Sequence, residues 1–390
     1  MTFFSQEKTL KRGSDASLLI GDIMGNIIDY IKWRGDLPLS KISFNDIDLL
    51  ILSELVYADM HSIVPSGYSS SVSVRDACIR LLVSPEEHSF GSEDCRALLT
   101  LLMKSDRFRD MQLTAYVDIS DERAEEQFCG MTVLLPDGTA AVVFRGTDAT
   151  INGWKEDFNL SFVPEVPAQR DAAEYLSNAG SALSCPLYIA GHSKGGNLAV
   201  YSAALSDPKI QARIIGIVNF DGPGFEDRMF ATASYMNICS RIRTYVPKSS
   251  VIGMLFSHLE EFTVVDSRNI GIFQHNPFNW EIMGNGFTTV RERTNSSYFI
   301  DSAMKDFLNK IDPGTREKII NTVFSILSEA GIRNVQELYR ARNIPLIIRI
   351  SRSLDPESRE VLHEALRLFK GSVKDTYLQL TKSSSLAPIR

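Results

Sequence analysis

The sequence predicts an α/β fold with a mostly parallel central sheet, a helical N-terminal region and a helical C-terminal extension. Two observations carry this prediction: strand-like and helical segments alternate between residues 113 and 296, and helical patterns without strands lie on either side. Such alternation is typical of a parallel sheet whose two faces are covered by helices. We therefore divide the 390 residues into a helical region at 1–112, a core at 113–296 and an extension at 297–390.

The N-terminal region carries apolar residues at helical spacing over residues 14–60, interrupted by the turn-rich segment WRGDLPLSKISFND. The segments VRDACIRLLV and DCRALLTLLMKS have the same spacing. We expect these helices to pack on the core.

The core begins with three strand-like segments, LTAYVDISD, CGMTVLLPDG and AAVVFRGTD, of which the last two are joined by a Pro-Asp-Gly turn. The helical segment AQRDAAEYLSNAGSAL then leads to the strand LYIA and to a helix that opens at Gly195. Three further strands are predicted, at IIGIVNFD, RIRTYVP and FTVVDS.

The C-terminal extension is predicted to be helical throughout. Asp312-Pro313 and Asp355-Pro356 each have the pattern of an N-cap followed by proline at the first helical position, and Gly331 is a suitable helix stop. Its mildly basic composition fits a solvated helical face. A peripheral contact with an anionic membrane stays open.

Composition excludes several classes of function. The net charge of −7 gives no basis for nucleic-acid binding, which usually needs a basic patch. No apolar run reaches the roughly 18 residues of a transmembrane helix, and the N-terminus has no apolar stretch typical of a secretory signal. We therefore expect a cytoplasmic protein. The sequence does not fix its oligomeric state.

The cysteines do not predict a metal or disulfide site. The chain has five of them, scattered and never in a C-x-x-C pair. We expect buried free thiols, no metal and no cofactor.

The stretch LYIAGHSKGGNLAVYSAALS, residues 187–206, carries the clearest chemical signal. A strand is followed at once by Gly191, Ser193 and Gly195 and then by a helical pattern, which is the context that a G-x-S-x-G nucleophile elbow needs. The small flanking residues let strand and helix approach closely, and the serine hydroxyl emerges at the sheet edge beside a helix N-terminus. Ser193 is the predicted nucleophile.

A serine nucleophile needs a base, and the chain has six histidines. His275 lies in the polar loop IFQHNPFNW after the last predicted strand, and we select it. His258, in GMLFSHLEEF, is embedded in a mostly apolar stretch read as helical, where a packed histidine is the simpler interpretation. His192 adjoins the serine, and we expect its side chain to point elsewhere.

The carboxylate that orients the base has two candidates between Ser193 and His275. Asp221 ends the apolar run IIGIVNF and should emerge at the same sheet edge as the serine. Asp266 ends FTVV and is the alternative, although DSRN also fits a solvated turn. We favour Asp221 on its position alone.

The oxyanion formed during acyl transfer needs fixed hydrogen-bond donors. The backbone N–H of Lys194 is one candidate. Thr147, in VVFRGTDATINGW, is the other, through its N–H and its hydroxyl. Arg145 is interpreted as structural, held by carboxylates such as Asp157, and Trp154 as a core residue.

At these residues the sequence resembles the class 3 lipases of the α/β-hydrolases, in VVFRGTDATINGWKEDFNL and IAGHSKGGNLA, with NFDGPGF and TYVPKSSVIGML at their next two strand ends. It is more similar to the bacterial Mbeg-like branch, on NIIDYIKWRGDLPLSKISFNDIDLLILSELVYADM, FDGPGF, VPKSSVIGML and QHNPFNW. The resemblance covers roughly residues 24–290 and implies an α/β-hydrolase fold. It does not extend to the C-terminal helices.

The sequence departs from the class 3 lipases at two points. Their acid lies just before the Val-Pro of the strand that ends TYVP here, where this chain has Thr244 and Tyr245. Their His-x-Gly-Phe signature before the elbow is replaced by VPAQRDAAEYL. The acid of those lipases is therefore not carried over to this chain.

Together these features predict a serine hydrolase that cleaves a carboxylic ester, of a small molecule or lipid-like, through an acyl-enzyme on Ser193. The apolar segments FNLSFVPEVP and SSVIGMLF are candidates for an acyl pocket or a lid. Two alternatives remain open: a non-catalytic binding module that keeps the fold, and an acyltransferase that passes the acyl group to an acceptor other than water.

Overall fold

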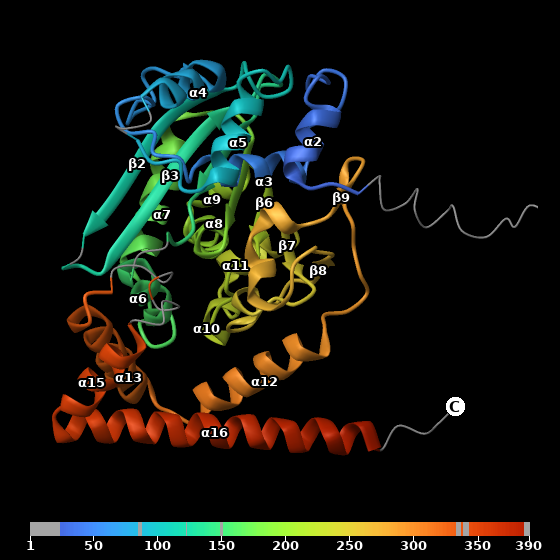
Figure 1. Ribbon diagram of the computed structural model, residues 1–390. Helices are drawn as coiled ribbons and strands as arrows, with labels where there is room; N and C mark the ends of the chain where they lie inside the picture. Colours follow the sequence, from blue (N-terminus) through green and yellow to red (C-terminus); the bar gives the residue numbers. More distant parts are fainter. Residues whose placement is uncertain are drawn as a thin grey trace, which may run out of the picture.

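The computed structural model describes residues 24–84, 88–121, 123–148, 151–332, 337 and 343–385. Helices lie on both faces of a central sheet, and a long C-terminal helix runs beneath this body (Figure 1). The part of the predicted N-terminal helical stretch that precedes residue 24 lies outside the described residues.

The central sheet confirms the predicted α/β fold. Its eight strands follow one another in chain order, antiparallel from β1 to β4 and parallel from β4 to β8, so the sheet is mixed and largely parallel. The strands are β1 (Val72–Ser73), β2 (Gln112–Asp121), β3 (Glu126–Leu134), β4 (Ala140–Phe144), β5 (Leu187–His192), β6 (Ile214–Phe220), β7 (Ile242–Pro247) and β8 (Phe262–Val265).

Both faces of the sheet are buried, as a parallel sheet requires. Alternate residues of β4 show this directly: Ala141 and Val143 pack with the N-terminal helices, and Val142 and Phe144 pack with α7 (Pro167–Ala182) and α8 (Lys194–Leu205). Side chains along a strand point to opposite faces in turn, so a wholly apolar strand lies between two layers. This explains the continuous apolar run AAVVF.

One face is covered by the N-terminal helices. Helix α3 lies directly on β4, β5 and β6, and its residues from Ile47 to Leu55 are all buried. A helix that is buried all round needs no polar stripe, which explains the run LLILSEL. The helices of this region are α2 (Ile27–Arg34), α3 (Asp46–Leu55), α4 (Val74–Val83) and α5 (Glu93–Leu102).

The opposite face is covered mainly by α7 and α8, with shorter helices at its margins. These shorter helices are α6 (Ile151–Asn159), α9 (Pro208–Gln211), α10 (Asp227–Phe230) and α11 (Ala233–Cys239). After β7 the chain forms three short 3₁₀ helices and a small hairpin: η1 (Ile252–Met254), η2 (Gly271–His275), η3 (Pro277–Asn279), β9 (Ile282–Met283) and β10 (Gly286–Phe287).

The stretch around His258 is not helical as predicted. After η1 the chain is irregular and pairs with Phe225 through a single bridge at Ser257. The backbone of Ser257 lies against Gly224 too closely to leave room for a Cβ there, and His258 Nε2 binds the carbonyl of Gly253. These tertiary contacts override the apolar pattern.

The C-terminal extension consists of helices that pack on one another and on α6. Asp312 caps α13 through the N–H of Thr315, and Gly331 has φ +66° just after the helix, so the predicted N-cap and stop are confirmed. The helices are α12 (Asn295–Asn309), α13 (Pro313–Glu329), α15 (Ile344–Ser353) and α16 (Pro356–Ser385).

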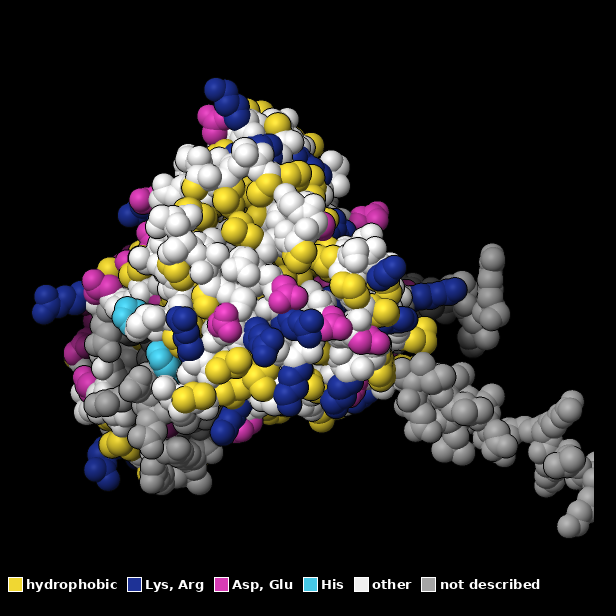
Figure 2. Space-filling model, turned by 90° about the horizontal axis from the view of Figure 1, so that it is seen from above, with side chains coloured by type: hydrophobic (Ala, Val, Ile, Leu, Met, Phe, Trp, Pro, Cys, Tyr) yellow, Lys and Arg dark blue, Asp and Glu magenta, His cyan; other side chains and the backbone are white. Residues whose placement is uncertain are grey.

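Figure 2 shows one face of the surface. Basic and acidic side chains are interspersed on it. Among the described residues, no helix combines the length and the apolar character needed to cross a bilayer.

A buried ion pair anchors the connector between α2 and α3. Arg107 donates to Asp48 with Nε–Oδ1 at 2.7 Å, and its other nitrogens donate to the carbonyls of Leu37, Ile42 and Ser43. Both charged side chains are fully buried. Burial raises the pKa of Asp48, and the Arg107 guanidinium opposes that rise.

We expect Arg107→Met to lower the free energy of unfolding by about 3–5 kcal/mol, because it leaves the Asp48 carboxylate buried without its partner. Urea unfolding at pH 7 measures the loss. The double variant Arg107→Met/Asp48→Asn should recover part of it, since the amide carries no charge. A loss below about 1 kcal/mol in the single variant would contradict this role.

Candidate active site

Ser193 lies at a strained junction between β5 and α8. Its backbone has φ 58° and ψ −134°, a region that non-glycine residues rarely occupy. The Ser193 N–H donates to the carbonyl of Phe220 at 2.9 Å, and the Ser193 carbonyl accepts from Gly196. The turn is therefore tied to β6 on one side and to the first turn of α8 on the other.

The glycines around Ser193 are required by close backbone approach. A Cβ at Gly191 would overlap the backbone of Gly195, and a Cβ at Gly195 would overlap the carbonyl of Phe144 at the end of β4. These distances leave no room for any side chain. The spacing of the motif GHSKG thus reflects the packing of β4, β5 and the start of α8.

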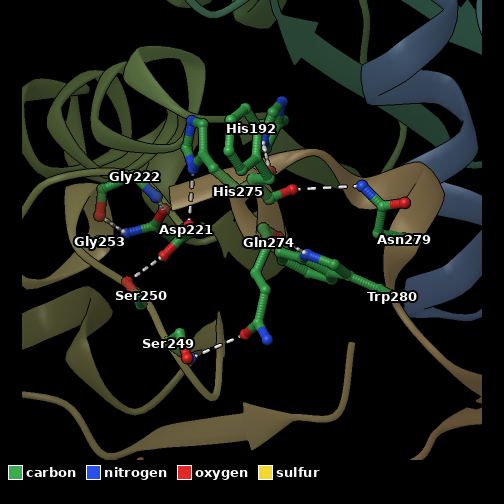
Figure 3. A network of polar contacts seen from close by, with 12 residues as sticks. His192, Asp221, Gly222, Ser249, Ser250, Gly253, Gln274, His275, Asn279 and Trp280 are labelled. Atoms are coloured by element: carbon green, nitrogen blue, oxygen red, sulfur yellow. Dashed lines mark hydrogen bonds and ion pairs between the residues drawn. The ribbon is translucent and has the colours of Figure 1, made fainter. Parts of the chain in front are cut away.

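Asp221 and His275 are in direct contact. The Asp221 Oδ2 lies 2.6 Å from His275 Nδ1, and the other carboxylate oxygen accepts from the Ser250 hydroxyl at 2.5 Å (Figure 3). Asp221 follows β6 and is fully buried, whereas the His275 side chain is 24% exposed. Since Nδ1 faces the carboxylate, Nε2 is the ring nitrogen left for other partners.

The two alternatives from the sequence lie elsewhere. Asp266 is paired with Lys248 and accepts from its neighbour's backbone N–H. The His258 side chain is 5% exposed and pairs with Glu260, which also accepts from the Thr244 hydroxyl. Burial alone would raise the pKa of Glu260, but the hydrogen bond and charge of His258 lower it to about 2. His258 is therefore a packed structural residue.

Of the two predicted oxyanion residues, Lys194 follows Ser193 in the chain and Thr147 lines the same cavity as Ser193. Lys194 is the first residue of α8, so its N–H has no acceptor within the helix. The Thr147 hydroxyl donates to Asp157 Oδ2 at 2.5 Å, so in this structure only the N–H of Thr147 remains as a candidate donor. Burial raises the pKa of Asp157 to about 6, and the positive charge of Lys194 opposes this rise.

Arg145 is structural, but its partner differs from the expected one. Its guanidinium binds Asp118 of β2 through two bonds of 2.7 and 2.8 Å rather than Asp157. Trp154 packs in the apolar cluster between α6 and α13, and it also contributes to the cavity wall. Its packing in that cluster agrees with the interpretation of Trp154 as a core residue.

The Lys194 side chain forms a buried ion pair behind the elbow. Its Nζ lies 2.6 Å from Glu156 Oε2 and donates to the carbonyl of Gln127 at 2.8 Å. Glu156 also accepts from the N–H groups of Gln127 and Ala168. This network joins α8 to α6, to β3 and to the start of α7.

A cavity of about 970 Å³ opens over Ser193 and His275. Its wall combines apolar side chains with carboxylates. The apolar members are Trp154, Ile252, Ile272, Phe273, Pro277 and Phe278, and the acidic members are Glu54, Asp59, Asp118, Asp148 and Asp157.

The segments predicted to line an acyl pocket contribute unequally. Ile252 of SSVIGMLF lies in the wall of the large cavity. Leu160, Val163 and Pro164 of FNLSFVPEVP instead line a separate cavity of about 280 Å³ beside Tyr201.

The sequence model of the Mbeg1-like family matches residues 102–325, which is more than half of the chain. The chain belongs to the Mbeg1-like family. This family is α/β-hydrolase-like and related to lipases, as the resemblance of the elbow implied. Comparison with curated proteins finds no match.

Three residues at the site of this Mbeg1-like chain were missed or only partly interpreted from the sequence. His192 does point away from the serine side chain, toward Glu54 and Tyr57 of the N-terminal region. The apolar pattern around Glu54 and Tyr57 predicts a core helix and names no partner for either residue. A carboxylate inside an otherwise apolar, buried helix was the available signal.

The described residues contain no group of three or more histidine, cysteine or acidic side chains arranged to hold a metal ion. The thiols of Cys78, Cys95 and Cys129 are buried, and burial raises the pKa of each.

We expect Ser193→Gly to be more stable than Ser193→Ala by about 1 kcal/mol, because only glycine adopts the positive φ without strain. Urea unfolding of the two variants measures the difference. Ser202, in the interior of α8, is the matched control: there alanine should be the more stable replacement. If the glycine and alanine variants had the same order of stability at both positions, the elbow would not be strained.

Proposed function

We propose that this Mbeg1-like protein is a serine hydrolase that cleaves a carboxylic ester through an acyl-enzyme on Ser193. The observation that carries the proposal is the 2.6 Å contact of Asp221 with His275. The His275 side chain lines the same cavity as Ser193, which stands on a strained strand-to-helix turn. Two predictions from the sequence stay as predictions. They are the division of the chain into three regions, with boundaries at residues 112/113 and 296/297, and a cytoplasmic location.

In the proposed mechanism, the Ser193 hydroxyl attacks the acyl carbon while His275 Nε2 takes its proton. The carbonyl electron pair moves onto oxygen, where the N–H groups of Lys194 and Thr147 stabilise the charge. Collapse expels the alcohol, which receives the proton from His275. Water then repeats the sequence on the acyl-enzyme and releases the acid.

Asp221 has a supporting role in this scheme. Its buried carboxylate keeps the proton on Nδ1 of His275 and favours the imidazolium that forms in each step. The Ser250 hydroxyl holds the second carboxylate oxygen, so the orientation of the pair is fixed on both sides. A catalytic pair needs this fixed orientation, so the arrangement favours a catalytic role for Asp221 and His275 over a purely structural one.

We expect a fluorophosphonate probe to label the wild-type protein and not Ser193→Ala. His275→Ala and Asp221→Asn should each lower kcat for 4-nitrophenyl acetate by about 10⁴-fold, because the first removes the base and the second favours the wrong tautomer. Hydrolysis assays with each purified variant measure these losses in kcat.

Asp266→Asn is the matched control for Asp221→Asn, since Asp266 is paired with Lys248. It should leave kcat unchanged. Absence of labelling in the folded wild-type protein would contradict the proposal and favour a non-catalytic binding module. Transfer of the acyl group to an added alcohol in preference to water would favour the acyltransferase.

The acidic cavity wall supports neutral rather than anionic esters as substrates. Arg145 is engaged by Asp118, while Asp59 and Asp157 add further negative charge to the wall. Like charge repels an anionic acyl group as it enters a partly desolvated cavity.

We therefore expect kcat/KM for mono-4-nitrophenyl succinate to be at least about tenfold lower than for 4-nitrophenyl butyrate, which corresponds to about 1.4 kcal/mol. Raising the salt concentration should bring the two kcat/KM values closer together, because salt screens exposed charges. Asp59→Asn should also bring the two values closer, because it removes one negative charge from the cavity wall. Equal kcat/KM values for the two esters would rule out this charge selection.

A further inference from the structure

A second histidine–carboxylate pair lies beside the first. The His192 side chain is 8% exposed, and its Nδ1 lies 3.1 Å from Glu54 Oε1. The ring of His192 lies against the ring of His275, with centroids 4.7 Å apart and planes at 36°. Its Nε2 lies 2.9 Å from the backbone carbonyl oxygen of His275 (Figure 3).

The partners of His192 fix where its protons lie. A carbonyl oxygen only accepts hydrogen bonds, so Nε2 carries a proton and donates to the His275 carbonyl. Nδ1 faces the Glu54 carboxylate and the Tyr57 hydroxyl, the latter at 3.2 Å. Burial alone would lower the pKa of His192, but the charge of Glu54 and, with less effect, that of Asp221 raise it.

Tyr57 extends this contact to the loop after β4. Its hydroxyl accepts from the N–H of Gly146 at 3.1 Å, next to Thr147. A Cβ at Gly146 would overlap both the Tyr57 hydroxyl and the carbonyl of His192. The end of α3 and the turn after it therefore contact the loop of the proposed oxyanion donor and, through His192, the turn that carries His275.

We propose that His192, held by Glu54 and Tyr57, is a positioning residue that fixes His275 for proton transfer, an inference that rests on the proposed hydrolase function. His275 ends the short 3₁₀ helix η2, and a hydrogen bond to its carbonyl fixes the backbone from which its ring extends. Ring contact with His192 then restricts the ring itself. Misplacement of a base by about 1 Å can cost about a hundredfold in rate.

Three substitutions test this inference: His192→Leu, Glu54→Gln and Tyr57→Phe. The readout is the hydrolysis of 4-nitrophenyl acetate by the full-length protein. We expect His192→Leu to lower kcat by about ten- to a hundredfold with a smaller effect on KM, because the His192 side chain is only 8% exposed and acts through His275. His192→Gln should recover part of kcat, since its amide N–H can donate to the same carbonyl.

The pH profile separates positioning from general stability. The groups that face His192 are Glu54, Tyr57, Asp221 and His275. His192 has a raised pKa in the folded protein, so its protonated form is kept at low pH and lost as the pH rises through that pKa. Removing the Glu54 charge lowers this pKa. The neutral ring has a single N–H, and when that proton is on Nδ1 the ring no longer donates to the His275 carbonyl, so Glu54→Gln should lose kcat at a lower pH than the wild type.

Tyr30→Phe is the matched control for Tyr57→Phe. It also removes a buried tyrosine hydroxyl from the N-terminal region, one that donates to Asp48 at 3.1 Å, and it should leave kcat unchanged. An equal loss in Tyr30→Phe would overturn the inference, because the effect would then reflect general destabilisation.

The remaining outcomes distinguish the inference from the function on which it rests. If the wild type turns over and all three variants keep its kcat and pH profile, His192 does not position His275 and the hydrolase proposal stands. If the folded wild type neither turns over nor reacts with a fluorophosphonate, both proposals are overturned.

Discussion

The candidate site depends on the close approach of three backbone segments at the junction of β5 and α8. Gly195 lies against the carbonyl of Phe144, Gly191 lies against Gly195, and Gly146 lies against the carbonyl of His192. No side chain fits at these glycines, so the helix begins directly at the sheet edge and Ser193 is driven to a positive φ. The hydrogen bond from Ser193 to Phe220 brings the end of β6 to the same edge. Because Asp221 follows Phe220, one steric constraint brings the serine and the acid together.

Buried charge holds this junction from behind. Glu156 has no exposed surface, yet it accepts hydrogen bonds from Lys194 and from two backbone N–H groups. A buried carboxylate with a cation and two amide donors offsets its desolvation far better than one with a single partner. The residue after the serine therefore has two tasks on different atoms. Its side chain joins α8 to α6, while its N–H stays at the helix start, beside the serine.

The sequence predicts those features whose cause is local. Alternating strand and helix patterns predict the sheet, and the glycine spacing around Ser193 predicts the elbow, because both depend on residues a few positions apart. Partner choice was less predictable: Arg145 binds Asp118 rather than Asp157, and Thr147 binds Asp157 through its hydroxyl. The first contact depends on which strands lie close together, and the second on how α6 packs beside the loop after β4. The contact of Glu54 with His192 joins residues far apart in the chain, so no window of sequence reveals it.

The N-terminal region and the C-terminal extension both pack near the loop after β4, one at each end of this loop. Tyr57, which lies outside the matched residues 102–325, binds the N–H of Gly146 where the loop begins. At the far end, Phe158 of α6 contacts Phe324 of α13 with ring centroids 5.9 Å apart, and Trp154 joins the same apolar cluster. The strands alone therefore do not determine the geometry of the site. Tyr57 of the N-terminal region binds the start of the proposed oxyanion loop, and α13 packs on α6, the helix that follows this loop.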